Sequence, residues 1–122
     1  MINYNEIKDK YPKAFELLIE WGYNLDIEGV FIDEEFGIIR FGSDEHIFND
    51  RYLYDFFDEN KICIEIFRVW IDWNDLTSFL WGGNVNGYNP TPFSEGVGTR
   101  QEAETAAFTK AFKLLEGKLL NK

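Results

Sequence analysis

The C-terminal 24 residues hold the pattern that most constrains the fold, a capped amphipathic helix. Thr99-Arg-Gln-Glu102 is a capping box, in which the threonine hydroxyl accepts a hydrogen bond from the N–H of Glu102 and the glutamate reaches back to the cap. Apolar side chains follow at helical spacing and form one stripe: Ala103, Ala107, Phe108, Ala111, Phe112, Leu115 and Leu119. Because alanines are small, we expect this helix to pack closely on a sheet or on another helix.

Another amphipathic helix is predicted within residues 9–22. Its apolar side chains recur at steps of three and four residues: Tyr11, Ala14, Phe15, Leu18 and Trp21. Pro12 suits the first turn, because its missing N–H would have no helical partner there. Gly22 can adopt the left-handed conformation that ends many helices. A further turn of helix is expected within residues 2–10.

Two β-hairpins are predicted from β-rich segments that turn residues separate. Their strands are residues 29–32 with 36–41, and residues 61–73 with 76–81. The long strand carries Ile62, Ile64 and Ile66 on one face, and Cys63, Phe67, Val69, Ile71 and Trp73 on the other. Apolar residues on both faces indicate a central strand or a partly covered second face. A second copy of the chain could supply that cover, which would make the protein a homodimer. Residues 82–98 are rich in glycine, asparagine and proline and predict a loop, with a short edge strand near Pro92–Ser94.

A third helix is predicted over residues 50–59, with Asn49 or Asp50 as its N-cap and Asn60 as a left-handed residue at its end. Leu53, Phe56 and Phe57 are expected to face inward. The order is then helix, hairpin, helix, hairpin, helix. This order predicts one α+β domain over residues 1–122, with two layers and with helices on one face of a small antiparallel sheet.

Negative charge is concentrated in residues 24–60, which contain eleven acids and two bases, Arg40 and Arg51. This segment has a net charge of −9, and the whole chain has a net charge of −10. Such a field repels nucleic acid and anionic lipid and attracts basic surfaces. We therefore expect a protein partner on this acidic side and no direct binding of nucleic acid or membrane. Two alternatives are a solvated surface that only maintains solubility, and a mimic of the phosphate backbone that blocks a host DNA-binding protein.

Leu53-Tyr-Asp-Phe-Phe-Asp-Glu-Asn60 and Thr99-Arg-Gln-Glu-Ala-Glu-Thr-Ala-Ala-Phe-Thr-Lys-Ala-Phe112 resemble segments of small uncharacterised proteins of phages and prophages of gut bacteria. The two segments are a helix and a capped amphipathic helix, and they cover about a fifth of the chain. The group has no established activity, so the resemblance implies no catalytic residue. It implies a context, that of an accessory protein of a mobile element.

Two sets of side chains are candidates for binding. The acidic set comprises Asp33, Glu34, Glu35, Asp44 and Glu45. The aromatic set comprises Trp70, Trp73 and Trp81, which cluster around the second hairpin and could stack on a small ligand or a peptide, with residues 82–98 as a lid. Cross-strand stabilisation of the sheet is the simpler interpretation of these tryptophans.

Catalysis and metal binding have weak support in the sequence. His46 and Cys63 are single residues of their type, and the adjacent acids do not match a calcium-binding loop. Cys63, between isoleucines, is expected to be a small buried hydrophobe. We predict no catalytic residue, no metal site and no cofactor. The lone cysteine, the lack of a signal-peptide pattern and the lack of a long apolar run predict a cytoplasmic protein.

Overall fold

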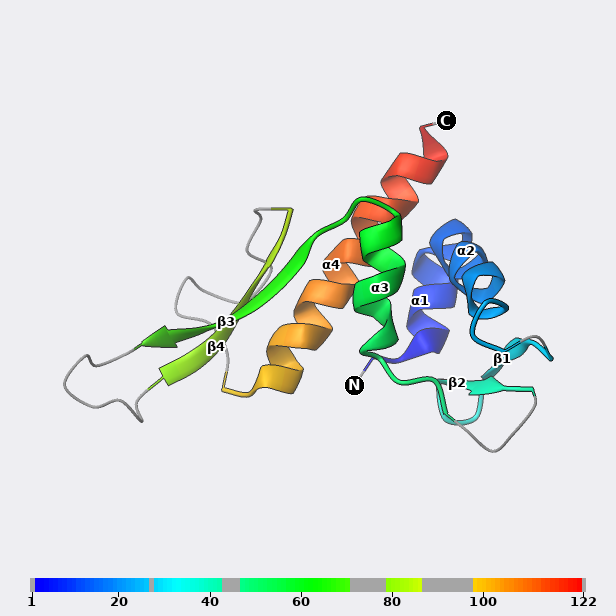
Figure 1. Ribbon diagram of the computed structural model, residues 1–122, viewed down its shortest axis with the longest axis horizontal. Helices are drawn as coiled ribbons and strands as arrows, with labels where there is room; N and C mark the ends of the chain where they lie inside the picture. Colours follow the sequence, from blue (N-terminus) through cyan, green and yellow to red (C-terminus); the bar gives the residue numbers. More distant parts are fainter. Residues whose placement is uncertain (1, 27, 43–46, 71–78, 87–97, 122) are drawn as a thin grey trace.

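The computed structural model describes residues 2–26, 28–42, 47–70, 79–86 and 98–121, and for residues 69 and 70 only the backbone. Its elements are α1 (Tyr4–Lys10), α2 (Pro12–Gly22), β1 (Val30–Asp33), β2 (Ile38–Phe41), α3 (Tyr52–Glu59), β3 (Ile64–Trp70), β4 (Phe79–Val85) and α4 (Arg100–Leu120). The α+β class and the order of helices and hairpins are confirmed, with the first helical unit made of α1 and α2 (Figure 1). None of the helices described here is long and apolar enough to cross a membrane.

The last helix, α4, is the central element of the fold (Figure 1). It lies between the β3–β4 hairpin on one side and the α1–α2 pair on the other, and α3 packs along it. Its capping box forms as predicted, with the N–H of Glu102 3.1 Å from the Thr99 hydroxyl. The Glu102 carboxylate accepts a hydrogen bond of 3.2 Å from that hydroxyl. Ala103, Ala107 and Ala111 are fully buried, which confirms the predicted apolar face.

Among the described residues, the strands form two separate antiparallel sheets of two strands each, β1–β2 and β3–β4. The β3–β4 register pairs Ile64 with Val85 and extends through Gly82 and Gly83. The prediction that a loop begins at Gly82 is therefore wrong. Glycine usually weakens a strand, but here it leaves room for a neighbouring side chain, because a Cβ on Gly83 would lie 3.1 Å from Cδ1 of Ile66 on β3. The expected edge strand near Pro92–Ser94 lies outside the described residues.

The β1–β2 hairpin packs against the end of α2 through Gly22. A Cβ on this glycine would lie 2.7 Å from Cγ2 of Val30, so the residue must be small. Gly22 does not adopt the left-handed conformation predicted for it, since the positive φ angles among the described glycines belong to Gly29 and Gly37. Position 22 therefore requires glycine because a larger side chain would collide with β1.

The core is built where α3 meets α4. Leu53, Phe56 and Phe57 are fully buried, as predicted, and the ring of Phe57 lies 4.9 Å from that of Phe112 in an edge-to-face arrangement. The ends of α3 differ from the prediction. Arg51 occupies the N-cap position, because the Asp50 carboxylate is engaged elsewhere, with the Tyr4 hydroxyl at 2.8 Å.

The Asn49 side chain caps a turn just before α3 instead, accepting a hydrogen bond of 2.9 Å from the Arg51 N–H. At the C-terminal end of α3, Asn60 has a φ of −97°, and the left-handed residue is Lys61, with a φ of 62°. The predicted cap residue and the predicted left-handed residue of this helix were therefore each wrong by one or two positions.

Candidate functional site

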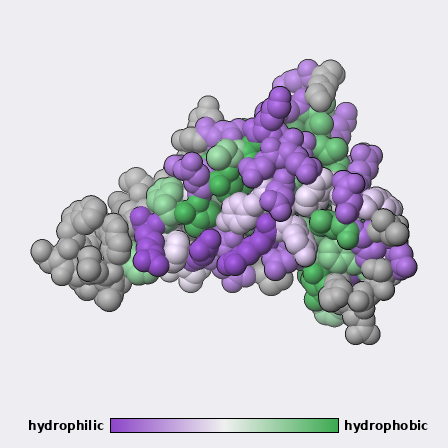
Figure 2. Space-filling view, in the orientation of Figure 1, coloured by the Kyte–Doolittle hydropathy of each residue, from purple (hydrophilic) through white to green (hydrophobic). Residues whose placement is uncertain are grey.

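The outward side of α3 carries three exposed carboxylates, those of Asp55, Asp58 and Glu59, which we call the acidic face. Residues spaced by three and four positions lie on one side of a helix, so these charges are neighbours. Among the described residues, no lysine or arginine lies within ion-pair distance of any of the three. Glu59 accepts a hydrogen bond of 2.6 Å from the indole of Trp21, which fixes its position. Figure 2 shows hydrophilic side chains gathered over this part of the molecule.

The predicted acidic set on the first hairpin is partly neutralised. The Asp33 carboxylate lies 2.9 Å from Nε of Arg40, and the hydrogen bond from this guanidinium lowers the pKa of Asp33. Glu34 lies 3.2 Å from the ammonium group of Lys8. Glu35 is exposed. The other two acids of this set, at positions 44 and 45, lie outside the described residues.

The predicted aromatic set is represented here by Trp81 alone, because Trp73 and the side chain of Trp70 lie outside the described residues. The ring of Trp81 lies under two guanidinium groups, that of Arg68 at 5.4 Å and that of Arg100 at 5.6 Å. Each contact is a cation–π interaction. Trp81 is therefore a platform for two arginines of the chain itself, which leaves less of it open to a ligand than the sequence analysis expected.

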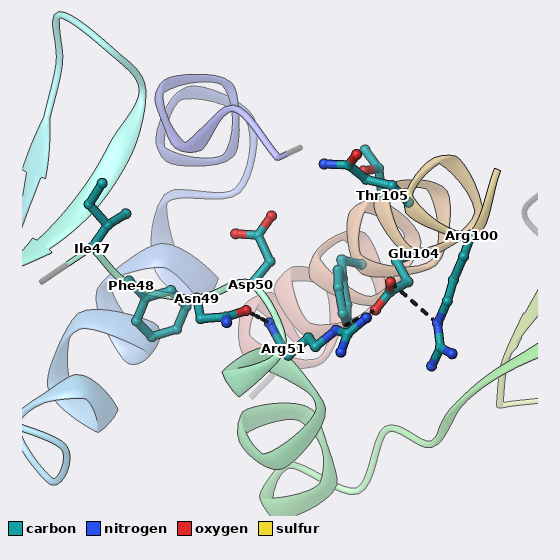
Figure 3. Close-up of a pocket in the computed structure, with 10 residues that line it drawn as sticks. Ile47, Phe48, Asn49, Asp50, Arg51, Arg100, Glu104 and Thr105 are labelled. Atoms are coloured by element: carbon teal, nitrogen blue, oxygen red, sulfur yellow. Dashed lines mark hydrogen bonds and ion pairs between the residues drawn. The ribbon is translucent and has the colours of Figure 1, made fainter.

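A pocket of about 590 Å³ lies where the segment that leads into α3 faces the first turns of α4 (Figure 3). Its floor is apolar and is formed by Phe48 and Phe108, both almost completely buried. Polar groups come from Asn49, Gln101 and Thr105, and charged groups from Asp50, Arg51, Arg100 and Glu104. A volume of this size is within the range of small-molecule sites. The sequence analysis did not find this pocket.

Glu104 is the central charged group of the pocket, although only 9 % of it is exposed. Its carboxylate accepts a hydrogen bond of 2.8 Å from the Tyr54 hydroxyl and lies 3.6 Å from Nε of Arg100 and 4.0 Å from Nε of Arg51. Burial, together with the hydrogen bond to the Glu104 carboxylate, raises the pKa of Tyr54 well above its usual range. One sequence signal was available, since an acid between Ala103 and Ala107 interrupts the apolar stripe and stands four residues after Arg100.

These groups can bind and orient a ligand. Cys63 is exposed, so the prediction that it is buried is wrong; it lies on the face of the hairpin opposite to Ile62 and Ile64. His46 lies outside the described residues. In the described part of the chain, no group of three or more histidine, cysteine or acidic side chains could hold a metal ion.

Comparison with known proteins gives no relative. No family model matches the chain, and neither a curated protein nor a solved structure matches it.

Proposed function

We propose that this chain is a cytoplasmic binding domain whose acidic face engages a basic surface on a protein partner. The observation that carries the proposal is that Asp55, Asp58 and Glu59 are exposed together, with no cation of the described chain within ion-pair distance. Like charges at these spacings repel one another by a few tenths of a kcal/mol per pair. A cationic partner would relieve that repulsion, and the charge would also accelerate encounter with it.

The acidic face is held on a rigid support and has an exposed aromatic side chain beside it. The opposite side of α3 is fixed in the core by Phe56 and Phe57, so the carboxylates need not be ordered on binding. Tyr52, three residues before Asp55 on the same helix, is 39 % exposed. An exposed aromatic side chain beside charged groups is typical of protein interfaces. If the chain is an accessory protein of a phage, as the resemblance of its two helical segments implies, the partner would come from the host cell.

The test is retention of host proteins by the immobilised domain, compared between two charge-reversal variants. D55K/D58K/E59K removes the acidic face. D9K/E16K/E65K makes the same change of net charge at three other exposed positions. We expect a partner that is retained by the wild type and by the second variant, is lost from the first, and elutes as salt is raised. Equal retention by the two variants would show that the acidic face does not bind it.

Imitation of nucleic acid is a narrower form of the same proposal, and it has less support. Asp55 and Glu59 are separated by about 6 Å along the axis of α3, at about 1.5 Å per residue. Duplex DNA presents a charge about every 1.7 Å, so the face would match only a few phosphates. A retained partner that releases bound DNA when the domain is added would support this form, whereas a partner that keeps its DNA would leave only the general proposal.

A further inference from the structure

In the pocket between residues 47–51 and α4, the negative side chains lie deeper than the positive ones. Its two carboxylates face inward and are already bonded, Glu104 to the Tyr54 hydroxyl and Asp50 to the Tyr4 hydroxyl and the N–H of Ile2. The two guanidinium groups face outward, with the side chains of Arg51 and Arg100 exposed by 66 % and 51 %. A molecule that enters the pocket therefore meets positive charge first, within a chain that is strongly acidic overall.

Arg100 is held in place before any ligand arrives. Glu104 lies 3.6 Å from its Nε, and the Trp81 ring lies 5.6 Å from the centre of its guanidinium. Nε of Arg51 lies 4.0 Å from the same Glu104 carboxylate, on the side opposite to Arg100 (Figure 3). Both ion pairs run through Nε, and the Arg100 guanidinium also interacts with the Tyr54 hydroxyl. Each guanidinium has five N–H groups, so several remain for a further acceptor. A guanidinium fork fits the paired oxygens of a carboxylate or phosphate, and prior fixation reduces the entropy lost on binding.

We propose that this pocket binds a small molecule that carries an oxyanion, a carboxylate or a phosphate, on an apolar body. The oxyanion would lie on the solvent side of Glu104, against the terminal N–H groups of Arg51 and Arg100. The apolar body would lie against Ile47, which is 50 % exposed, above the buried rings of Phe48 and Phe108. The amide side chains of Asn49 and Gln101 would take its remaining polar groups. This site is separate from the acidic face and does not depend on a protein partner.

The experiment is a nuclear magnetic resonance titration of the whole 122-residue chain, with backbone amide and arginine Nε–H signals observed. The probes are phenylacetate and phenyl phosphate, and 2-phenylethanol serves as a neutral probe of similar shape. We expect both anions, or one of them, to shift the Nε–H signals of Arg51 and Arg100 and the amides of residues 47–51 and 100–108. Which anion binds more tightly distinguishes a carboxylate ligand from a phosphate ligand.

The matched variants are R51Q/R100Q and R68Q. Arg68 also lies over Trp81 but does not line the pocket, so R68Q removes an equivalent exposed charge from the same region. R51Q/R100Q should weaken anion binding about tenfold or more, because hydrogen bonds to charged groups are lost, whereas R68Q should not. R51Q/R100Q/E104Q replaces the double variant if the unpaired Glu104 carboxylate destabilises the fold.

Three results would overturn the proposal. The first is the absence of any shift at millimolar concentrations of either anion. The second is an equal response to 2-phenylethanol, which would make the pocket merely apolar. The third is an equal loss of binding in R68Q and R51Q/R100Q, which would show that the anions respond only to general positive charge. None of these results bears on the acidic face.

Discussion

Replacement of Glu116 should destabilise the fold through a helix that lies far from it in the sequence. Helix α2 begins at Pro12 without a side-chain cap, because its N-cap residue is Tyr11. The backbone N–H of Ala14, a fully buried residue, donates instead to the Glu116 carboxylate of α4 at 2.8 Å. Glu116 is itself only 7 % exposed. The carboxylate therefore acts as an N-cap for α2 supplied by another helix.

The expected cost of E116A is about 2 kcal/mol of unfolding free energy. Loss of an N-cap typically costs about 1 kcal/mol, and a buried N–H without a partner costs about 1–3 kcal/mol, two estimates that overlap. For a domain of this length, the melting temperature should fall by about 6–12 °C. E116Q keeps an acceptor oxygen and loses only the interaction of charge with the helix dipole, so it should cost under about 1 kcal/mol.

The measurement is thermal and urea unfolding followed by circular dichroism, with E16A and E16Q as controls. Glu16 lies on α2 itself and is exposed, so its replacement changes charge and helix propensity without touching the cap. The predicted order of stability is wild type, then E116Q, then E116A, with both Glu16 variants close to wild type. If E116Q proves as unstable as E116A, the hydrogen bond to Ala14 does not contribute as proposed. If E116A matches E16A, Glu116 is not a cap.

Two further predictions concern the helical glycines and the buried tyrosines. G22A should lower the unfolding free energy by about 1–3 kcal/mol, because the new Cβ would overlap Val30. G117A should raise it by about 0.5–1 kcal/mol, because no atom lies within 4 Å of the new Cβ. Equal effects of the two variants in urea unfolding would contradict the steric explanation of Gly22. The pKa values of Tyr4 and Tyr54 are raised, so both should stay neutral in the folded state at a pH above 10, the ordinary pKa of a free tyrosine. The contribution of these two tyrosines to stability is present below pH 10 and is lost as the pH rises further. In an alkaline titration, the ultraviolet absorbance of tyrosinate should therefore rise in a late phase that coincides with unfolding. Y54F should reduce the amplitude of that late phase.

The elements were predictable wherever a local pattern decides them. The capping box at Thr99 and the inward face at Leu53, Phe56 and Phe57 depend on short-range spacing alone, and both are confirmed. The errors occur where a distant residue takes part. Gly22 ends α2 as predicted, but it is required by contact with β1 and not by a left-handed conformation. Asp50 was predicted as a cap, but its carboxylate is bonded to Tyr4.

The candidate sites show the same division. The acids of α3 lie within the acidic segment found in the sequence, although the binding set predicted from that segment did not include them. Trp81 was predicted as a site residue, but its role as a platform for Arg100 depends on how the hairpin lies against α4. The pocket could not be predicted from the sequence, because its lining combines residues 47–51 with residues 100–108, about 50 positions away. The one signal of the pocket in the sequence was Glu104, an acid that interrupts the apolar stripe of α4.

Burial of acids on α4 makes the surface charge more asymmetric than the sequence indicates. The last 24 residues have a formal charge of +2, with three acids among them. Glu104 and Glu116 are turned inward, while Lys113 and Lys118 remain exposed, so the surface of α4 is more basic than that sum. The acidic face belongs to α3, which packs along α4, so this pair of helices carries a local charge dipole in addition to the net charge of the chain.

A dipole orients an approaching partner, whereas net charge alone only attracts it. D55K/D58K/E59K reverses the acidic end of this dipole, and D9K/E16K/E65K changes net charge by the same amount without touching α3. If orientation matters, the association rate for a basic partner should fall more in the first variant at low salt, and the two rates should converge as salt screens the field. Equal rates at all salt concentrations would mean that net charge alone governs the encounter, and that the arrangement of acids on α3 gives the partner no preferred approach.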